Sequence, residues 1–163
     1  MVGEQGLCDE FLSQLKQRFP TKNLGELKMY TGCAFERDWD KGTLEMDQTA
    51  FAKNMVQQYN ISATSNIPES PGVDLGPRQD SEPGGNEEFP KYHALVGSLM
   101  WLSVTTRPDI ANALRACARH SHNNPSPRHW KALFQVAAYV NATKEMGLRF
   151  VRSFSLRLSV YAD

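Results

Sequence analysis

The sequence predicts an α+β fold: a β-hairpin with flanking helices, then a linker, a three-helix bundle and two terminal strands. Three observations support this prediction. Apolar residues recur at helical spacing in several segments, alternate with polar residues in others, and a proline- and glycine-rich acidic stretch divides the chain. The chain has 163 residues, 40% hydrophobic and 10% aromatic, which is the composition of a globular protein and not of a disordered or collagen-like one.

Residues 1–60 are predicted to hold a helix, a hairpin and a second helix. In the first helix, over 7–19, the apolar residues share one face, and Pro20 ends the helix. Apolar and polar residues alternate over 27–36, and a short strand follows a turn at Gly42. This pattern predicts a β-hairpin.

The second helix, over 51–59, leads into a different kind of sequence. Its apolar residues share one face, and Asp47 is placed to cap it. We expect residues 61–91 to form an acidic linker, because residues 68–90 are rich in proline and glycine and hold six acidic residues against one basic residue. This linker is expected to be exposed.

Residues 92–146 are predicted to form a bundle of three helices. The first carries apolar residues at helical spacing, the second begins at Pro108, and the third begins at Ser126-Pro127, where a capping serine precedes a proline. After Gly147, the last segment, 147–163, contains two short alternating runs. These runs predict a pair of strands.

Charge is distributed unevenly along the chain. The whole sequence has 18 basic and 18 acidic residues, but residues 91–163 hold ten basic and three acidic ones. A positive field over this half favours polyanions as partners.

Cysteines, histidines and the N-terminal sequence bear on metal binding and location. The three cysteines form no C-x-x-C motif, which fits a reduced compartment. Cys117 precedes three histidines, His120, His122 and His129. A buried thiol and exposed histidines explain this group better than a metal site. No signal peptide and no apolar run of bilayer length is visible, so we expect an intracellular protein, cytoplasmic or nuclear, with no membrane partner.

Five phrases occur along the chain in a fixed order. They are Lys22 to Lys28 with Gly32, Tyr92 to Leu102, Thr106 to Ile110, His129 to Ala132, and Gly147-Leu148 with the final Val160 to Asp163. Together they resemble the C-terminal part of a copia-type retrotransposon reverse transcriptase, which is a portion of a Pol polyprotein. The resemblance implies that residues 1–60 end the palm, 92–146 form the thumb, and 147–163 begin a ribonuclease H-like sheet.

The resemblance also implies which residues hold a primer–template duplex. The hairpin at Met29 to Gly32 would grip the primer strand, where a glycine permits close backbone approach. The first two thumb helices would lie along the duplex, near its minor groove and its phosphates. The expected nucleic-acid-binding residues are Met29, Tyr30, Thr31, Gly32, Gly97, Ser98, Trp101, Arg107, Arg115 and Arg119.

Catalytic chemistry is where this sequence departs from the family. Two adjacent aspartates bind the polymerase Mg²⁺ ions in the family, and this chain contains no Asp-Asp pair. Asp163 matches the first ribonuclease H carboxylate, without the other carboxylates of that site. We therefore expect this chain alone to be inactive and to bind no cofactor, since Mg²⁺ belongs to the family's complete enzyme.

Two kinds of function stay open at this stage. The first is a polymerase portion that retains primer- and template-handling surfaces, with weak, salt-dependent binding of an RNA/DNA or DNA duplex and with the missing polymerase portion as a partner. The second is a non-enzymatic module, either a co-opted nucleic-acid binder or a helical scaffold. Strand runs at both ends that look cut off favour the first.

Overall fold

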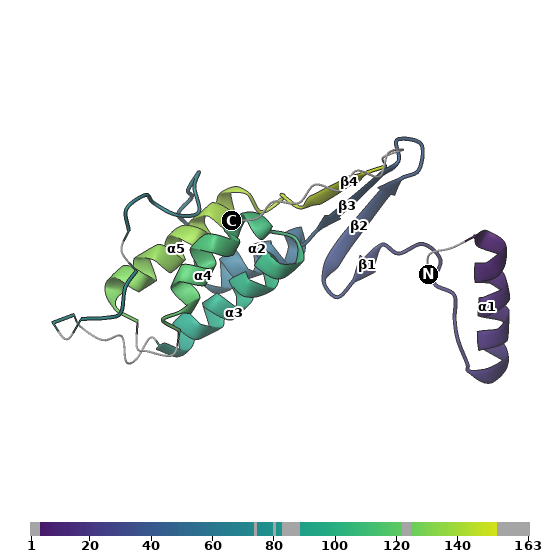
Figure 1. Cartoon of the computed structure of the whole chain (residues 1–163), viewed down its shortest axis with the longest axis horizontal. Coiled ribbons are helices and arrows are strands. Elements are labelled where there is room, and N and C mark those ends of the chain that lie inside the picture. The colour runs from purple at the N-terminus through teal and green to yellow at the C-terminus, as the bar shows by residue number, and fades with distance from the viewer. Residues whose placement is uncertain (1–3, 74, 80, 83–88, 122–124, 153–163) are drawn as a thin grey trace, which may run out of the picture.

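A computed structural model of the chain describes residues 4–73, 75–79, 81–82, 89–121 and 125–152. It contains a helical bundle and a four-stranded antiparallel sheet that extends from one end of the bundle (Figure 1). A further helix, α1 (Gln5–Arg18), stands apart from both. The helices and the antiparallel sheet of the α+β prediction are therefore present.

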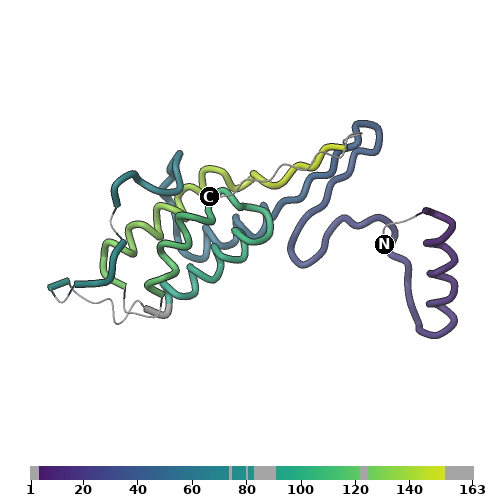
Figure 2. Tube along the Cα trace, in the orientation of Figure 1, coloured from purple at the N-terminus to yellow at the C-terminus, as the bar shows by residue number. Residues whose placement is uncertain are grey.

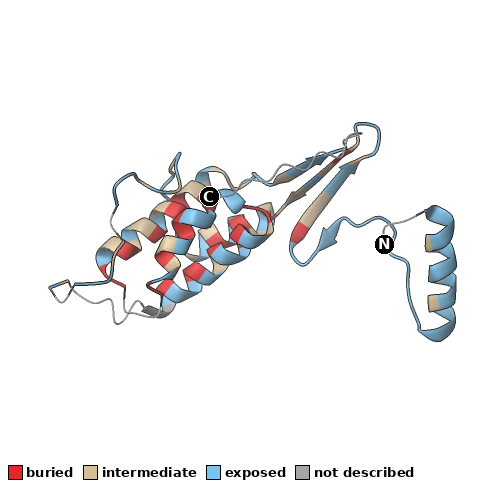
Figure 3. Ribbon diagram, in the orientation of Figure 1, coloured by how far each residue is buried: buried red, intermediate tan, exposed pale blue. Residues whose placement is uncertain are grey.

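Helix α1 ends at Arg18, just before Pro20, as the sequence predicts. It has no buried residue, although its apolar residues share one face. Figure 3 shows this helix exposed along most of its length. The amphipathic pattern has therefore produced a helix whose apolar face has no covering in this structure.

The sheet is built on the predicted hairpin. Strands β2 (Cys33–Asp38) and β3 (Thr43–Asp47) pair antiparallel. The turn between them passes through Gly42, whose φ of +63° favours glycine. Strand β1 (Met29–Tyr30) pairs with the other edge of β2, and the strand order is β1-β2-β3-β4.

Strand β4 (Leu148–Val151) corrects the prediction for the C-terminal strands. It pairs antiparallel with β3, so residues 148–151 complete the hairpin sheet and do not begin a separate one. Leu44 lies opposite Phe150 in this pairing. The register is the one that puts apolar side chains of both strands on the same face. The other predicted strand, over 156–161, lies outside the described residues.

The bundle contains α2 (Thr49–Gln58), α3 (Phe89–Thr105), α4 (Ala111–Ala118) and α5 (Pro127–Ala142). All four helices contribute buried apolar side chains to one core. Among the described residues, no helix has both the length and the apolar character that crossing a bilayer requires.

Local signals place the helix starts as predicted. The Thr49 N–H donates to Asp47 Oδ1 at 2.8 Å, at the start of α2. Pro108 begins a short 3₁₀ turn, η1 (Pro108–Ile110), which leads directly into α4. At the start of α5, the Ser126 N–H donates to His129 Nδ1 at 3.0 Å, which forms one half of a capping box.

The described residues of the 61–91 segment are mostly exposed, as expected, but much of the segment is not detached from the bundle. Residues 61–73 and 75–79, which we call the strap, lie against the bundle. Asn141 Nδ2 donates to the carbonyls of Ile61 and Ala63, at 3.1 and 3.0 Å. Further along, Ser70 Oγ donates to Gln135 Oε1 at 2.8 Å. Because the strap forms no regular element, side chains of α5 satisfy polar groups that would otherwise need water.

Candidate nucleic-acid interface

The β1–β2 turn holds the first group of predicted residues. Thr31 and Gly32 have φ values of +48° and +78°, the positive values that two-residue hairpin turns use. Met29 and Tyr30, before the turn, are 60% and 63% exposed. Because β3 ends beside the start of β2 and α2 follows at once, the turn lies at the end of the sheet next to the bundle (Figure 2).

The second group lies on α3. A Cβ built on Gly97 would meet no atom within 4 Å, so the helix backbone is open to close approach there. Trp101, one turn further along, is 40% exposed. The hydroxyl of Ser98 donates to the Ala94 carbonyl at 3.0 Å, which leaves its oxygen as an acceptor only. An open backbone beside an indole ring is a surface on which a sugar or a base can pack.

The third group lies on α4 and at its end. Arg115 and Arg119 are both exposed and lie one helical turn apart. Among the described residues, neither guanidinium forms an ion pair. Both side chains can therefore neutralise phosphates without breaking an internal contact.

Arg107 does not belong to this surface, and the prediction that it contacts phosphate is wrong. Its side chain is 3% exposed. The guanidinium pairs with both carboxylate oxygens of Asp109, at 2.8 and 3.0 Å, and donates to the Thr143 carbonyl at 2.9 Å. Partial burial alone would raise the pKa of Asp109, but the hydrogen bonds and charge of Arg107 hold it below its ordinary value. Arg107 therefore joins the start of η1 to the end of α5.

The remaining predicted residues come from three separate elements. Helices α3 and α4 pack against each other, whereas the β1–β2 turn packs extensively against neither. Asp163, the candidate ribonuclease H carboxylate, lies outside the described residues. A ligand that touched all three groups would have to span the sheet and the bundle, which is what a duplex can do.

Sequence reasoning missed a pair of buried histidines beneath the strap. His120 and His129 are 8% and 0% exposed, contrary to the expectation of exposed histidines, and their ring centroids lie 4.2 Å apart. His129 Nε2 lies 3.1 Å from the Gly76 carbonyl, and His120 Nε2 bonds to the Leu75 carbonyl. Burial lowers the pKa of His129, so its ring is neutral at pH 7. The sequence signal for the capping role of His129 is the Ser126-Pro127-x-His129 phrase, in which the histidine follows the capping serine by three residues.

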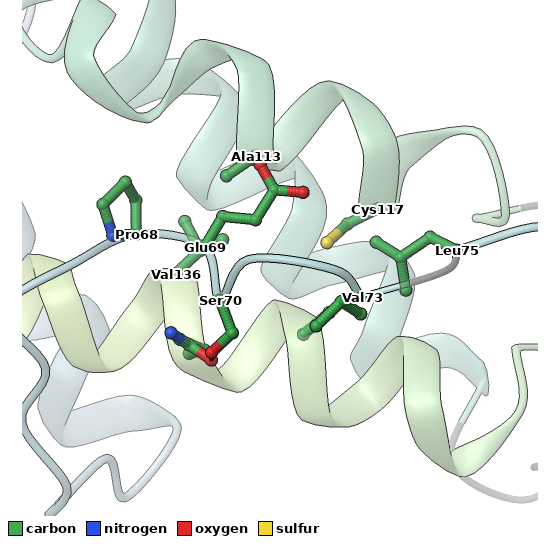
Figure 4. A pocket seen from close by; sticks show the side chains of 10 residues that line it. Pro68, Glu69, Ser70, Val73, Leu75, Ala113, Cys117 and Val136 are labelled. Atoms are coloured by element: carbon green, nitrogen blue, oxygen red, sulfur yellow. Dashed lines mark hydrogen bonds between the residues drawn. The ribbon is translucent and has the colours of Figure 1, made fainter.

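The described residues around these histidines show no metal-binding cluster and no cavity for an organic ligand. Among the described residues, no group of three or more His, Cys, Asp or Glu is placed to hold a metal ion. Cys117 is buried, and burial raises the pKa of its thiol to about 12. The cavity beside it, between the strap and helices α4 and α5, measures about 10 Å³ (Figure 4). Such a volume admits one water molecule at most.

Curated proteins similar to this chain include transposon proteins. The chain is 27% identical to the retrovirus-related Pol polyprotein from transposon TNT 1-94 of Nicotiana tabacum over 146 residues, 86% of this chain and 11% of the polyprotein. It is 21% identical to a transposon Ty5-1 protein of Saccharomyces cerevisiae over 157 residues, 96% of this chain and 50% of that protein. Secreted RxLR effector protein 161 of Plasmopara viticola is 39% identical over 72 residues, 44% of this chain and 50% of the effector.

These relatives define the origin of the chain at a coarse level. The matched region covers about half the length of two of them and 11% of the tobacco polyprotein. No family profile and no solved structure matches the chain. Similarity to transposon proteins along nearly the whole chain shows that it is related to retrotransposon Pol polyproteins.

Proposed function

We propose that this chain is the primer-grip hairpin and thumb portion of a copia-type reverse transcriptase, and that it binds a nucleic-acid duplex. Its relation to Pol polyproteins supports the origin. The order of the five sequence phrases supports the particular portion. Duplex binding rests above all on Arg115 and Arg119, two exposed cations without an ion-pair partner among the described residues.

Each group of residues would meet a different part of the duplex. The β1–β2 turn presents Tyr30 and a tight backbone turn, which suit the primer strand. The open backbone at Gly97 allows α3 to approach a shallow minor groove. The two arginines would contact phosphates, which add affinity without reading sequence. Binding is therefore expected to be weak, salt-dependent and independent of sequence.

We assign no polymerase or ribonuclease H step to this chain. Both reactions need several carboxylates that converge on Mg²⁺. The described residues offer no such group, and the sequence contains no Asp-Asp pair. The described residues do not fit the metal, and polymerase chemistry would require the remaining polymerase portion.

Fluorescence anisotropy with a labelled RNA/DNA hybrid tests this function. The dissociation constant would be measured over a range of salt concentrations for the wild type, Arg115→Ala and Arg119→Ala. Each substitution should lower the slope of log K against log salt by about 0.9, the loss of one phosphate contact. Arg18→Ala is the matched control for α4, because Arg18 ends α1, which stands apart from α3 and α4 (Figure 1).

Three outcomes are distinguishable. Lower slopes in the two α4 variants, with an unchanged slope for Arg18→Ala, support the proposed surface. Binding with unchanged slopes in all variants would remove α4 from the interface. No binding even at low salt would contradict the proposal and favour a helical scaffold without a nucleic-acid role.

A further inference from the structure

One face of the sheet is largely apolar, and no helix among the described residues covers it. The register places six large apolar side chains on this apolar sheet face, of which the middle four are half-buried: Tyr30, Phe35, Leu44, Met46, Leu148 and Phe150. Arg37 and the buried Cys33 lie on the same face. No described helix packs extensively against the sheet, and Tyr30 and Phe150 are 63% and 52% exposed. Antiparallel sheets usually bury one such face against a core. The apolar sheet face is therefore a surface that lacks its partner.

A hollow of about 440 Å³ lies at the end of this face, away from the bundle. Its lining includes Arg37, Trp39, Leu44, Phe150 and Arg152. The Arg37 guanidinium lies 4.6 Å from the centroid of the Trp39 ring. The only carboxylate in the lining, Asp38, forms an ion pair with Lys41 at 2.8 Å. The lining of the hollow thus combines apolar side chains with two arginines, Arg37 and Arg152.

Helix α1 has the complementary properties. Leu7, Phe11 and Leu15 form its apolar stripe, and the first two are 64% and 53% exposed. A single helix of 14 residues is marginally stable in water, so α1 needs a surface to pack on. Its length of about 21 Å matches the roughly 20 Å of a six-residue strand.

Charge also matches α1 to the hollow. Residues 4–15 of the chain contain three acidic side chains, Glu4, Asp9 and Glu10, and no basic one. The lining of the hollow includes Arg37 and Arg152. An α1 helix laid along the apolar sheet face with its first turns at the hollow would therefore bring opposite charges together.

The connector between α1 and β1 directs the helix away from its own sheet. Beside β2, the chain is held by the Trp39 Nε1–H, which donates to Glu26 Oε1 at 3.0 Å. Just before that point, the Gly25 N–H donates to Asn23 Oδ1 at 2.9 Å, and Gly25 has a φ of +78°. The connector therefore turns at Asn23–Gly25 on its way from α1 to the sheet. Figure 1 shows α1 standing clear of the strands.

We propose that two copies of this chain exchange their α1 helices, each packing its stripe on the apolar sheet face of the other. An extended arm beside a vacant surface of matching shape is the arrangement found in domain-swapped dimers. The contact would also take in Phe19, which directly follows α1, and Trp39, which lines the hollow. Burying the exposed halves of Phe11, Phe19, Tyr30, Trp39 and Phe150 removes about 500 Å² per contact from water. Two such contacts per dimer reach about 1,000 Å², the lower limit of a specific interface.

Sedimentation equilibrium of the full chain over a concentration series tests the exchange. The wild type should dimerise, and Phe11→Gln on α1 and Phe150→Gln on the sheet should each weaken the dimer. Each dimer carries the substitution twice, so a tenfold loss per contact raises the dissociation constant about a hundredfold. Ser13→Gln and Glu36→Gln are matched controls, because they place the same residue on the opposite faces of the helix and the sheet, and Glu36 is exposed and lies outside the lining of the hollow.

A mixture of the two weakened variants separates exchange from other arrangements. In a mixed dimer, the intact helix of the Phe150→Gln chain meets the intact sheet of the Phe11→Gln chain. The other contact of the mixed dimer carries both substitutions. Because Phe11 and Phe150 belong to that one contact, the second substitution adds little to the loss caused by the first, and the mixture should dimerise up to about tenfold more tightly than either variant alone. Equal weakness of the mixture would overturn the exchange and indicate closure within one chain or packing of sheet on sheet.

A wild-type chain that stays monomeric at all concentrations would also overturn the proposal. It would leave the apolar sheet face for another polypeptide. This test uses no nucleic acid, so its failure is distinguishable from a failure of the proposed function. Tyr30 belongs to both surfaces, so the exchanged helix and a primer strand would compete for it.

Discussion

Replacing Arg107 with alanine separates a structural arginine from a nucleic-acid contact. The substitution removes the paired contact with Asp109 and the hydrogen bonds to the carbonyl and hydroxyl of Thr143, at 2.9 and 2.6 Å. Breaking a buried ion pair costs about 3–5 kcal/mol. Asp109 is 32% exposed and regains hydration, so we expect a loss of about 3 kcal/mol in the free energy of unfolding. In a chain of this size, that loss lowers Tm by about 6–12 °C.

Thermal unfolding followed by circular dichroism measures this loss, and Arg115→Ala is the control. Arg115 is exposed and has no ion-pair partner among the described residues, so its removal should change the free energy of unfolding by less than about 0.5 kcal/mol. Duplex binding should show the reverse pattern. Arg107→Ala should keep the salt slope of the wild type below its Tm, while Arg115→Ala should lower it.

Two results would refute this reasoning about Arg107. One is a Tm for Arg107→Ala within about 2 °C of the wild type, since the contacts of Arg107 with Asp109 and Thr143 would then contribute little to the free energy of unfolding. The other is a salt slope that falls by about 0.9 while the protein remains folded. The second result would place Arg107 at a phosphate, which its burial in the structure does not allow.

Three further predictions concern Gly97 on α3, the buried His129 and the buried Cys117. Gly97→Leu should raise the free energy of unfolding by about 0.5–1 kcal/mol in thermal melts, because leucine favours helices and its side chain would enter open space. The same substitution should weaken duplex binding in fluorescence anisotropy. Unchanged binding would argue against close approach of the duplex to α3 at Gly97. Because burial lowers the pKa of His129 below the 6.5 of an unfolded histidine, the unfolded chain binds more protons, and stability present above pH 6.5 is lost as the pH falls through the folded pKa. The fall in Tm from about pH 7 to 5 should be smaller in His129→Asn, and an equal fall would assign the effect to other groups. Iodoacetamide followed by mass spectrometry should label Cys117 more slowly in the folded than in the unfolded protein, because its pKa is about 12 and its side chain is buried; equal rates would contradict that burial.

Short-range signals in the sequence were sufficient to locate most elements. Pro20, Gly42, Pro108 and the Ser126-Pro127 pair each act within a few residues, through a fixed φ, a positive φ or a capping hydrogen bond. Such effects are visible in the sequence without knowledge of the fold. The hairpin and the starts of the helices were therefore predictable.

Burial of polar side chains was not predictable in the same way, because it depends on distant partners. The sequence predicts Arg107 to be a solvated cation, whereas in the structure Thr143, 36 residues away, supplies a carbonyl and a hydroxyl that accept its hydrogen bonds. His129 reads as exposed until Gly76, 53 residues away, supplies an acceptor. The strap is largely exposed, as its composition predicts, but its hydrogen bonds to Asn141 and Gln135 could not be predicted from that composition. In the errors on Arg107 and His129, a polar group assigned to water is instead bonded to a distant part of the chain.

The pairing of β4 with β3 changes how the candidate interface should be understood. The bundle lies between two neighbouring strands, since α2 begins two residues after β3 ends and β4 follows α5. The return to the sheet passes close to β3 at Gly147, where a Cβ would collide with the Met46 carbonyl. In addition, the Thr106 hydroxyl donates to Gln48 Oε1 at 2.9 Å, which ties the end of α3 to the start of α2. The stretch of chain that forms the bundle is thus joined to the sheet where it begins, after β3, and where it ends, before β4. The fold itself therefore sets the placement of the β1–β2 turn relative to α3 and α4, and a duplex that spans them would meet a surface already in place, at a lower cost in ordering.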